Sequence, residues 1–130
     1  SVLLGFIAER GASADTVLPY VYDRQAAETH IVTAIEEMAA GRVDAIALTS
    51  SGQVRRLVEA AKANRLEAKL QEEMDRTPVA SVGPVVSDEL AAYGFKTDLV
   101  PREGAFFMRP LIAVVAAELT KAPPRAQAAR

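Results

Sequence analysis

The stretch that decides the fold is Val43-Asp44-Ala45-Ile46-Ala47-Leu48-Thr49-Ser50-Ser51-Gly52-Gln53-Val54, residues 43–54. It begins as a short apolar run and then breaks into three small hydroxyl residues and a glycine. After the turn, apolar residues recur at spacings of three and four, at Val54, Leu57, Val58 and Ala61. The pattern predicts a buried strand over Asp44–Leu48 that leads through a turn into a helix, which is one step of a parallel α/β sheet.

The hydroxyl-rich turn is the first candidate binding site. It follows the carboxyl end of the predicted strand, which is where open α/β sheets bind their ligands. Thr49, Ser50 and Ser51 can cap the helix, and with Gly52 they would present first-turn N–H groups to a negatively charged ligand. The alternative is that this turn only caps its helix.

The rest of the chain alternates between helical and strand patterns. We expect helices over residues 2–9, 28–40, 87–93 (capped by Ser87) and 104–119, and a helical region over 53–75 that bends at Asn64. Further strands are expected over residues 16–22, 77–82 and 95–100. This alternation predicts the α/β class, with a parallel sheet covered by helices on both faces in a flavodoxin-like or Rossmann-like three-layer arrangement.

The predicted order begins with a helix, whereas a doubly wound domain normally begins with a central strand. We therefore expect residues 1–121 to form a single α/β domain whose first strand is missing. Residues 122–130 are rich in proline, alanine and arginine, a composition typical of a disordered tail.

The composition excludes several classes of protein. Half of the 130 residues are hydrophobic, 25% are charged and the net charge is −2, so there is no basic field suited to nucleic acid. The chain has no cysteine, which rules out thiolate metal sites and fits a reducing cytoplasm, and a single histidine, His30, cannot build a histidine cluster. We expect no membrane partner, because no apolar run approaches the length of a membrane span.

Three groups of residues together resemble a known family. Gly11-Ala12 precedes a strand that ends in Val21-Tyr22, residues 43–51 form the β-α step described above, and Ser81-Val82-Gly83-Pro84 is followed by Leu90 and Gly94. In this order and spacing, from about Glu9 to Leu119, the chain resembles the second, C-terminal half of uroporphyrinogen-III synthases. The resemblance implies two similar α/β domains with the active site in the cleft between them.

The resemblance also implies an activity and a set of site residues. The family cyclises hydroxymethylbilane to uroporphyrinogen III, with loss of water and inversion of ring D, in tetrapyrrole biosynthesis. It is a hydro-lyase that needs neither a metal nor an organic cofactor. Tyr22 would be the catalytic residue, and the substrate would bind at two turns, one formed by Thr49, Ser50, Ser51 and Gly52 and the other by Gly83, Pro84, Val85 and Val86.

One departure from the family supports an alternative function. The family usually has a threonine or two after Gly-Pro, whereas Val85 and Val86 stand here and cannot donate a hydroxyl hydrogen bond. The alternative is a non-catalytic, synthase-like sensor or regulatory domain that binds a small anionic ligand. Such a domain would reach nucleic acid only through a fused DNA-binding domain.

The chemistry of the reaction agrees with these residue types. The substrate carries eight carboxylates and a hydroxymethyl group that leaves readily, so the main task of the enzyme is to position a flexible chain. Helix N-termini and hydroxyl turns suit this task, because their N–H groups bind carboxylates. Tyr22 could act as a general acid at the leaving hydroxyl, or it could only pack its ring at a strand end. Arg55 or Arg56 could reach a substrate carboxylate, or both could belong to a solvated helix face.

The missing half of the cleft has consequences for this chain by itself. We expect the isolated domain to be inactive without its partner domain, because only part of the substrate would be held. A homodimer is also expected, since the absence of a central strand would leave the backbone groups of its neighbours unpaired.

Overall fold

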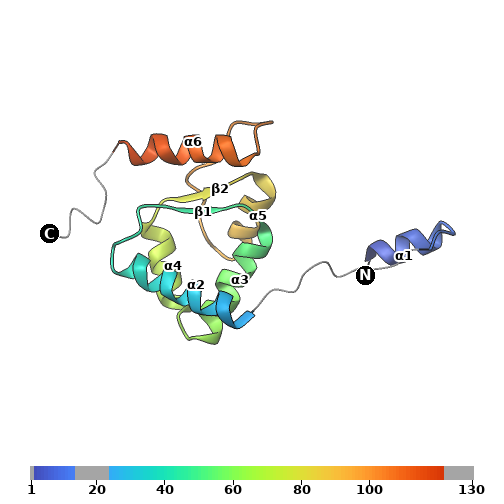
Figure 1. Cartoon of the computed structure of the whole chain (residues 1–130), viewed down its shortest axis with the longest axis horizontal. Helices are drawn as coiled ribbons and strands as arrows, with labels where there is room; N and C mark the ends of the chain where they lie inside the picture. The colour runs from blue at the N-terminus through green and yellow to red at the C-terminus, as the bar shows by residue number, and fades with distance from the viewer. Residues whose placement is uncertain (1, 14–23, 122–130) are drawn as a thin grey trace.

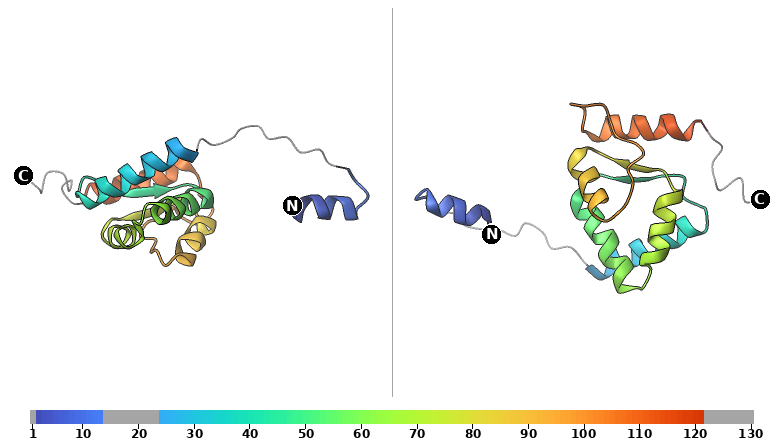
Figure 2. Two further views of the ribbon diagram at one scale, coloured as in Figure 1. Left: turned by 90° about the horizontal axis from the view of Figure 1, so that it is seen from below. Right: turned by 180° about the vertical axis from the view of Figure 1, so that it is seen from behind.

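The computed structural model describes residues 2–13 and 24–121. Its elements, in chain order, are α1 (Val2–Glu9), α2 (Arg24–Ala39), β1 (Ile46–Leu48), α3 (Ser51–Ala63), α4 (Glu67–Arg76), β2 (Val79–Ser81), α5 (Pro84–Ala92) and α6 (Met108–Leu119). Figure 1 shows the two strands in the middle of the body, α6 on one side of them and α2 to α5 on the other. Helix α1 lies apart from this body in Figure 1 and in both views of Figure 2.

The sheet is parallel, as the alternating pattern predicts. β1 and β2 pair in parallel with Ile46 opposite Val79 and Leu48 opposite Ser81. Both strands are shorter than the predicted ranges 44–48 and 77–82. They keep the apolar centre of each run, and Ile46 N–H already donates to the Pro78 carbonyl at 2.9 Å.

The predicted strand over 95–100 is wrong as a full strand, because only one parallel bridge forms there, between Ala80 and Leu99. The N–H groups of Asp98 and Leu99 both donate to the Val79 carbonyl, at 2.8 and 3.0 Å, and this shared acceptor breaks the regular ladder. The Asp98 carboxylate in turn accepts the Val79 N–H at 2.8 Å. The segment therefore lies beside β2 at the position of a third strand but carries a single ladder step.

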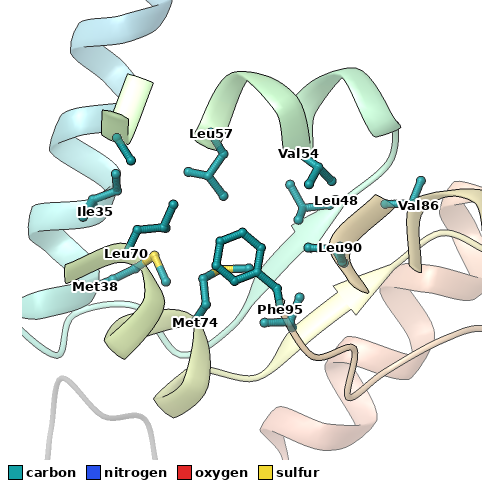
Figure 3. Close-up of a cluster of buried hydrophobic side chains, with 12 residues drawn as sticks. Ile35, Met38, Leu48, Val54, Leu57, Leu70, Met74, Val86, Leu90 and Phe95 are labelled. Atoms are coloured by element: carbon teal, nitrogen blue, oxygen red, sulfur yellow. The ribbon is translucent and has the colours of Figure 1, made fainter. Parts of the chain in front are cut away.

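The main hydrophobic core fills the space between one face of the sheet and helices α2 to α5. Its side chains come from both strands and all four helices, together with Phe95 in the loop after α5 (Figure 3). The members are Ile35, Met38, Leu48, Val54, Leu57, Ala61, Leu70, Met74, Val79, Val86, Leu90 and Phe95. The two strands and four helices thus share one cluster, which holds the short strands in place by the burial of apolar side chains.

The opposite face of the sheet is covered by α6. Side chains alternate across a strand, so Ala47 and Ala80 point away from the main core. Ala80 is fully buried, and Leu111 of α6 is 1% exposed. Ala47 of β1 remains exposed on the same face. Helices therefore lie on both faces, and the cover over β1 is thinner than the cover over β2.

Within residues 2–13 and 24–121, each predicted helix is present, and several begin at a different residue. The predicted bend at Asn64 is confirmed, because α3 ends at Ala63 and α4 starts at Glu67. The predicted start of a helix at Ser87 is wrong, since α5 begins at Pro84. Proline at a first helical position lacks only an N–H that would have no partner there, and its fixed φ suits the helix. The last helix begins at Met108 rather than at Gly104, which sits in a turn at φ 78°.

The predicted strand over 16–22 and the predicted tail over 122–130 both lie outside the described part of the chain. None of the helices within residues 2–13 and 24–121 has both the length and the apolar character needed to cross a membrane.

Candidate functional site

The parallel register brings the two predicted binding turns to the same edge of the sheet. Leu48 and Ser81 are paired at the carboxyl ends of β1 and β2, and the Val82 N–H donates to the Leu48 carbonyl at 3.0 Å. Neighbouring strands lie about 4.8 Å apart. The turn that opens α3 and the turn that opens α5 are therefore side by side, and both helices direct their N-termini toward this edge.

The first turn is built as a reciprocal cap around Gln53. The Ser50 hydroxyl accepts the Gln53 N–H at 3.3 Å. The Gln53 side-chain oxygen accepts the N–H of Thr49 at 2.7 Å, the Thr49 hydroxyl at 3.1 Å and the N–H of Ser50 at 3.2 Å. The sequence Ser50-x-x-Gln53 is a capping box. Its spacing could have identified Gln53 from the sequence as a residue of this turn.

This cap decides which groups of the first turn remain for a ligand. The N–H groups of Thr49, Ser50 and Gln53 are already bonded within the turn. Ser51 and Gly52 are the first two helical residues, and their N–H groups have no acceptor inside the helix by its geometry. The capping interpretation is therefore correct for Ser50, and the N–H groups that can meet an anion belong to Ser51 and Gly52.

The second turn is held by the hydroxyls of Ser81 and Ser87, a pairing that the sequence did not predict. Ser81 is fully buried, and its hydroxyl lies 2.6 Å from that of Ser87 and 3.3 Å from the Gly83 carbonyl, to which it donates. Ser87 therefore does not cap α5 but ties its first turn to the end of β2. Gly83 is the residue before the helix, and Pro84 occupies its first position.

The two valines that follow Gly83-Pro84 have different environments. Val86 is 4% exposed and packs in the main core beside Leu90 (Figure 3). Val85 is 71% exposed at the start of α5. Only Val85 is thus placed to meet a ligand at this edge, whereas Val86 serves the packing of α5.

An aromatic side chain from a distant loop covers the second turn. A Cβ placed on Gly83 would lie 3.0 Å from Cγ of the Phe106 ring, so the ring rests directly on the glycine backbone. Phe106 is 37% exposed and Phe107 is 68% exposed. The loop before α6 therefore adds an apolar wall to the edge, a contribution that sequence spacing could not reveal.

An ion pair links the two helices that begin at these turns. The Arg55 guanidinium lies 3.1 Å from the Glu89 carboxylate and links α3 to α5. Half of the Arg55 side chain is exposed, so it can exchange this partner for another carboxylate. Away from these turns, the guanidinium of Arg42, on the loop into β1, hydrogen-bonds the Glu37 carboxyl of α2 and lowers its pKa.

Tyr22 lies outside the described residues. Within those residues, no three histidine, aspartate or glutamate side chains gather closely enough to hold a metal ion. Three surface hollows are lined by other segments: between α2 and α3, along α6 and β1, and between α6 and the loop at Arg102–Ala105.

Comparison with known proteins places these observations in a family context. Residues 1–106 match the family described as uroporphyrinogen-III synthase HemD. The fold is similar to the crystal structure of uroporphyrinogen III synthase from the bacterium Thermus thermophilus, with 28% sequence identity and a TM-score of 0.62 over 92% of this chain. A mutant of that enzyme gives a TM-score of 0.64 over 93% of this chain, at the same identity. No curated protein matches significantly. The chain spans 45% and 46% of these two structures, about half their length.

Proposed function

The chain belongs to the uroporphyrinogen-III synthase family, and we propose that it forms one side of the substrate cleft of such an enzyme. The complete enzyme would be a cyclising hydro-lyase of tetrapyrrole biosynthesis. It would close hydroxymethylbilane to uroporphyrinogen III, with loss of water and inversion of ring D. The cysteine-free chain suits the reducing cytoplasm in which we place this reaction.

The observation that carries this proposal is the pair of helix N-termini at one edge of the sheet. Positive partial charge at each N-terminus favours the carboxylates of the substrate. The N–H groups of Ser51 and Gly52 and the exposed start of α5 at Pro84 would bind side-chain carboxylates. The apolar wall formed by Phe106 would contact a pyrrole ring, since an aromatic side chain offers a flat apolar surface.

The reaction itself requires little general acid or base catalysis. Electron release from the pyrrole nitrogens expels the hydroxyl of the substrate, so the enzyme must mainly hold the chain in the geometry in which the correct carbon attacks. Tyr22 is the proposed proton donor to the leaving hydroxyl. A general acid of this kind contributes about 10²–10⁴-fold.

Product analysis with fresh hydroxymethylbilane tests the proposal. The chain by itself should leave the spontaneous, uninverted isomer as the product, at the same rate with and without protein. Supplied with the half that its relatives carry in addition, it should yield an excess of the III isomer. An excess of the III isomer from the chain alone would show that one half suffices, and none from the reconstituted, folded pair would exclude the synthase activity.

A second candidate function rests on Val85. This exposed position has no hydroxyl, so a synthase-like sensor that binds a linear tetrapyrrole without converting it is the alternative. Calorimetric titration with a stable linear tetrapyrrole carboxylate separates the two functions. Binding by the reconstituted protein without any III isomer favours the sensor, whereas binding with turnover favours the enzyme.

A further inference from the structure

The ion pair between α3 and α5 uses little of the binding capacity of its arginine. Nη1 of Arg55 donates to one carboxylate oxygen of Glu89 at 3.1 Å. Among the described residues, this is the one hydrogen bond of the Arg55 guanidinium, which carries five N–H donors. The Arg55 side chain is 50% exposed and the Glu89 side chain is 23% exposed. The guanidinium is therefore held by a single bond and is open to water.

Helix geometry directs both side chains toward the two binding turns. Arg55 follows Ser51 by four residues on α3, so the two share a helix face. Glu89 follows Val85 by four residues on α5 in the same way. Side chains on a helix lean toward its N-terminus and cover the turn before their own Cα. The ion pair therefore borders the starts of both helices, where the carboxylates of the substrate are proposed to bind.

The bond between the two side chains is of a kind that a ligand can replace. An exposed ion pair contributes little stability, because water screens the charges and two long side chains lose freedom. A guanidinium binds a carboxylate most strongly through two parallel N–H···O bonds. Arg55 makes one such bond with Glu89. A ligand carboxylate that aligns with two nitrogens of Arg55 would gain a bond that Glu89 does not supply.

We propose that Arg55 binds a substrate carboxylate at this edge and that Glu89 is an internal competitor, which the substrate displaces. The inference rests on the proposed function, since its ligand is the substrate with eight carboxylates. Ring closure removes water and leaves all eight carboxylates on the product. A carboxylate of the protein that returns to Arg55 therefore also favours release of the product.

Titration with uroporphyrin III, a stable octacarboxylate related to the proposed product, tests the inference by fluorescence anisotropy. Glu89→Gln keeps the shape of the side chain and removes its charge, so it should tighten binding about twofold to fivefold, as expected from the loss of one exposed ion pair. Arg55→Gln should weaken binding about tenfold, because a charge-assisted hydrogen bond is lost. The matched control, Glu118→Gln, makes the same change of charge in the Lys121–Glu118 pair at the end of α6 and should leave the affinity unchanged.

The double substitution shows whether the effect of Glu89 passes through Arg55. In Arg55→Gln/Glu89→Gln the gain seen in Glu89→Gln should disappear, because the guanidinium for which Glu89 competes is absent. Equal tightening in Glu89→Gln and Glu118→Gln would mean that only net charge matters and would overturn the inference. Binding of uroporphyrin III with one affinity by the natural chain, Arg55→Gln and Glu89→Gln would overturn the inference and leave the proposed function standing. No binding by any of these proteins would overturn the inference together with the proposed role of this edge.

Discussion

At the scale of single residues, the cap at Ser50 separates a structural role from a binding role. Ser50→Ala removes the acceptor of the Gln53 N–H and should lower the free energy of unfolding by about 1 kcal/mol. In the complete enzyme it should also slow cyclisation by about tenfold to a hundredfold, because the adjacent N–H groups of Ser51 and Gly52 lose their orientation. Chemical denaturation and steady-state rates measure the two effects.

The matched control is Thr33→Ala. The Thr33 hydroxyl donates to the Thr29 carbonyl on the exposed side of α2, far along the chain from the turn. This substitution should change neither quantity appreciably. Complete loss of activity in Ser50→Ala, with the fold intact, would contradict catalysis by positioning and would assign the hydroxyl a chemical role.

Substitution of threonine for each valine after Gly83-Pro84 should affect stability differently. Val86→Thr buries a hydroxyl in the main core and should destabilise the fold by about 1–3 kcal/mol. Val85→Thr changes an exposed side chain and should leave stability within about 0.5 kcal/mol. If the edge binds carboxylates, the new hydroxyl of Val85→Thr should also tighten ligand binding. Thermal unfolding and calorimetric titration decide both points, and a destabilised Val85→Thr would mean that α5 is packed differently.

At the scale of elements, the contact between Gly83 and Phe106 joins the start of α5 to the loop before α6. Gly83→Ala puts a methyl group into the Phe106 ring and should cost about 1–3 kcal/mol of stability, because the ring must move. Since the ring is a side chain and not backbone, Phe106→Ala in the same chain should restore most of the loss, and a double-mutant cycle would measure the coupling.

Gly52→Ala is the control for Gly83→Ala. At Gly52 an added Cβ would meet only the Ser50 hydroxyl, at 3.8 Å. Gly52→Ala should therefore be tolerated, since alanine favours a helix over glycine. If Gly83→Ala were equally harmless and showed no coupling to Phe106, the loop would not form the wall of the site.

At the scale of the whole molecule, one edge of the sheet is open within the described residues. β1 pairs with β2 through Ile46 and Leu48, so the backbone groups of Ala47, between them, face the other side of the strand. We expect light scattering at micromolar protein to report more than a monomer, because an unpaired strand edge recruits a second strand.

Ala47→Pro tests whether the edge is responsible. It removes the outward N–H without removing a bond to β2, and it should shift the protein toward the monomer. A natural chain that is monomeric throughout, or a proline variant that associates to the same extent, would contradict pairing at this edge.

Short-range patterns in the sequence were sufficient for the class of fold and for part of the site. The apolar run at Ile46–Leu48, the periodicity after Val54 and the small residues between them act over a few residues, so the β-α step and the Ser50 cap could be predicted. The break at Asn64 followed in the same way. These features depend on local hydrogen bonds and on which side chains share a face, and both can be read from spacing.

Only the tertiary structure decided the features that join distant parts of the chain. In it the Phe106 ring lies on Gly83, and Leu99 pairs with Ala80 in a single bridge. Val86 is buried in the core, whereas Val85 is exposed. The tertiary structure also opened α5 at Pro84, ahead of the predicted start at Ser87. The physical reason is that each outcome depends on which elements pack together. Spacing along a sequence determines the face on which a side chain lies, whereas the packing of the whole chain determines what that face meets.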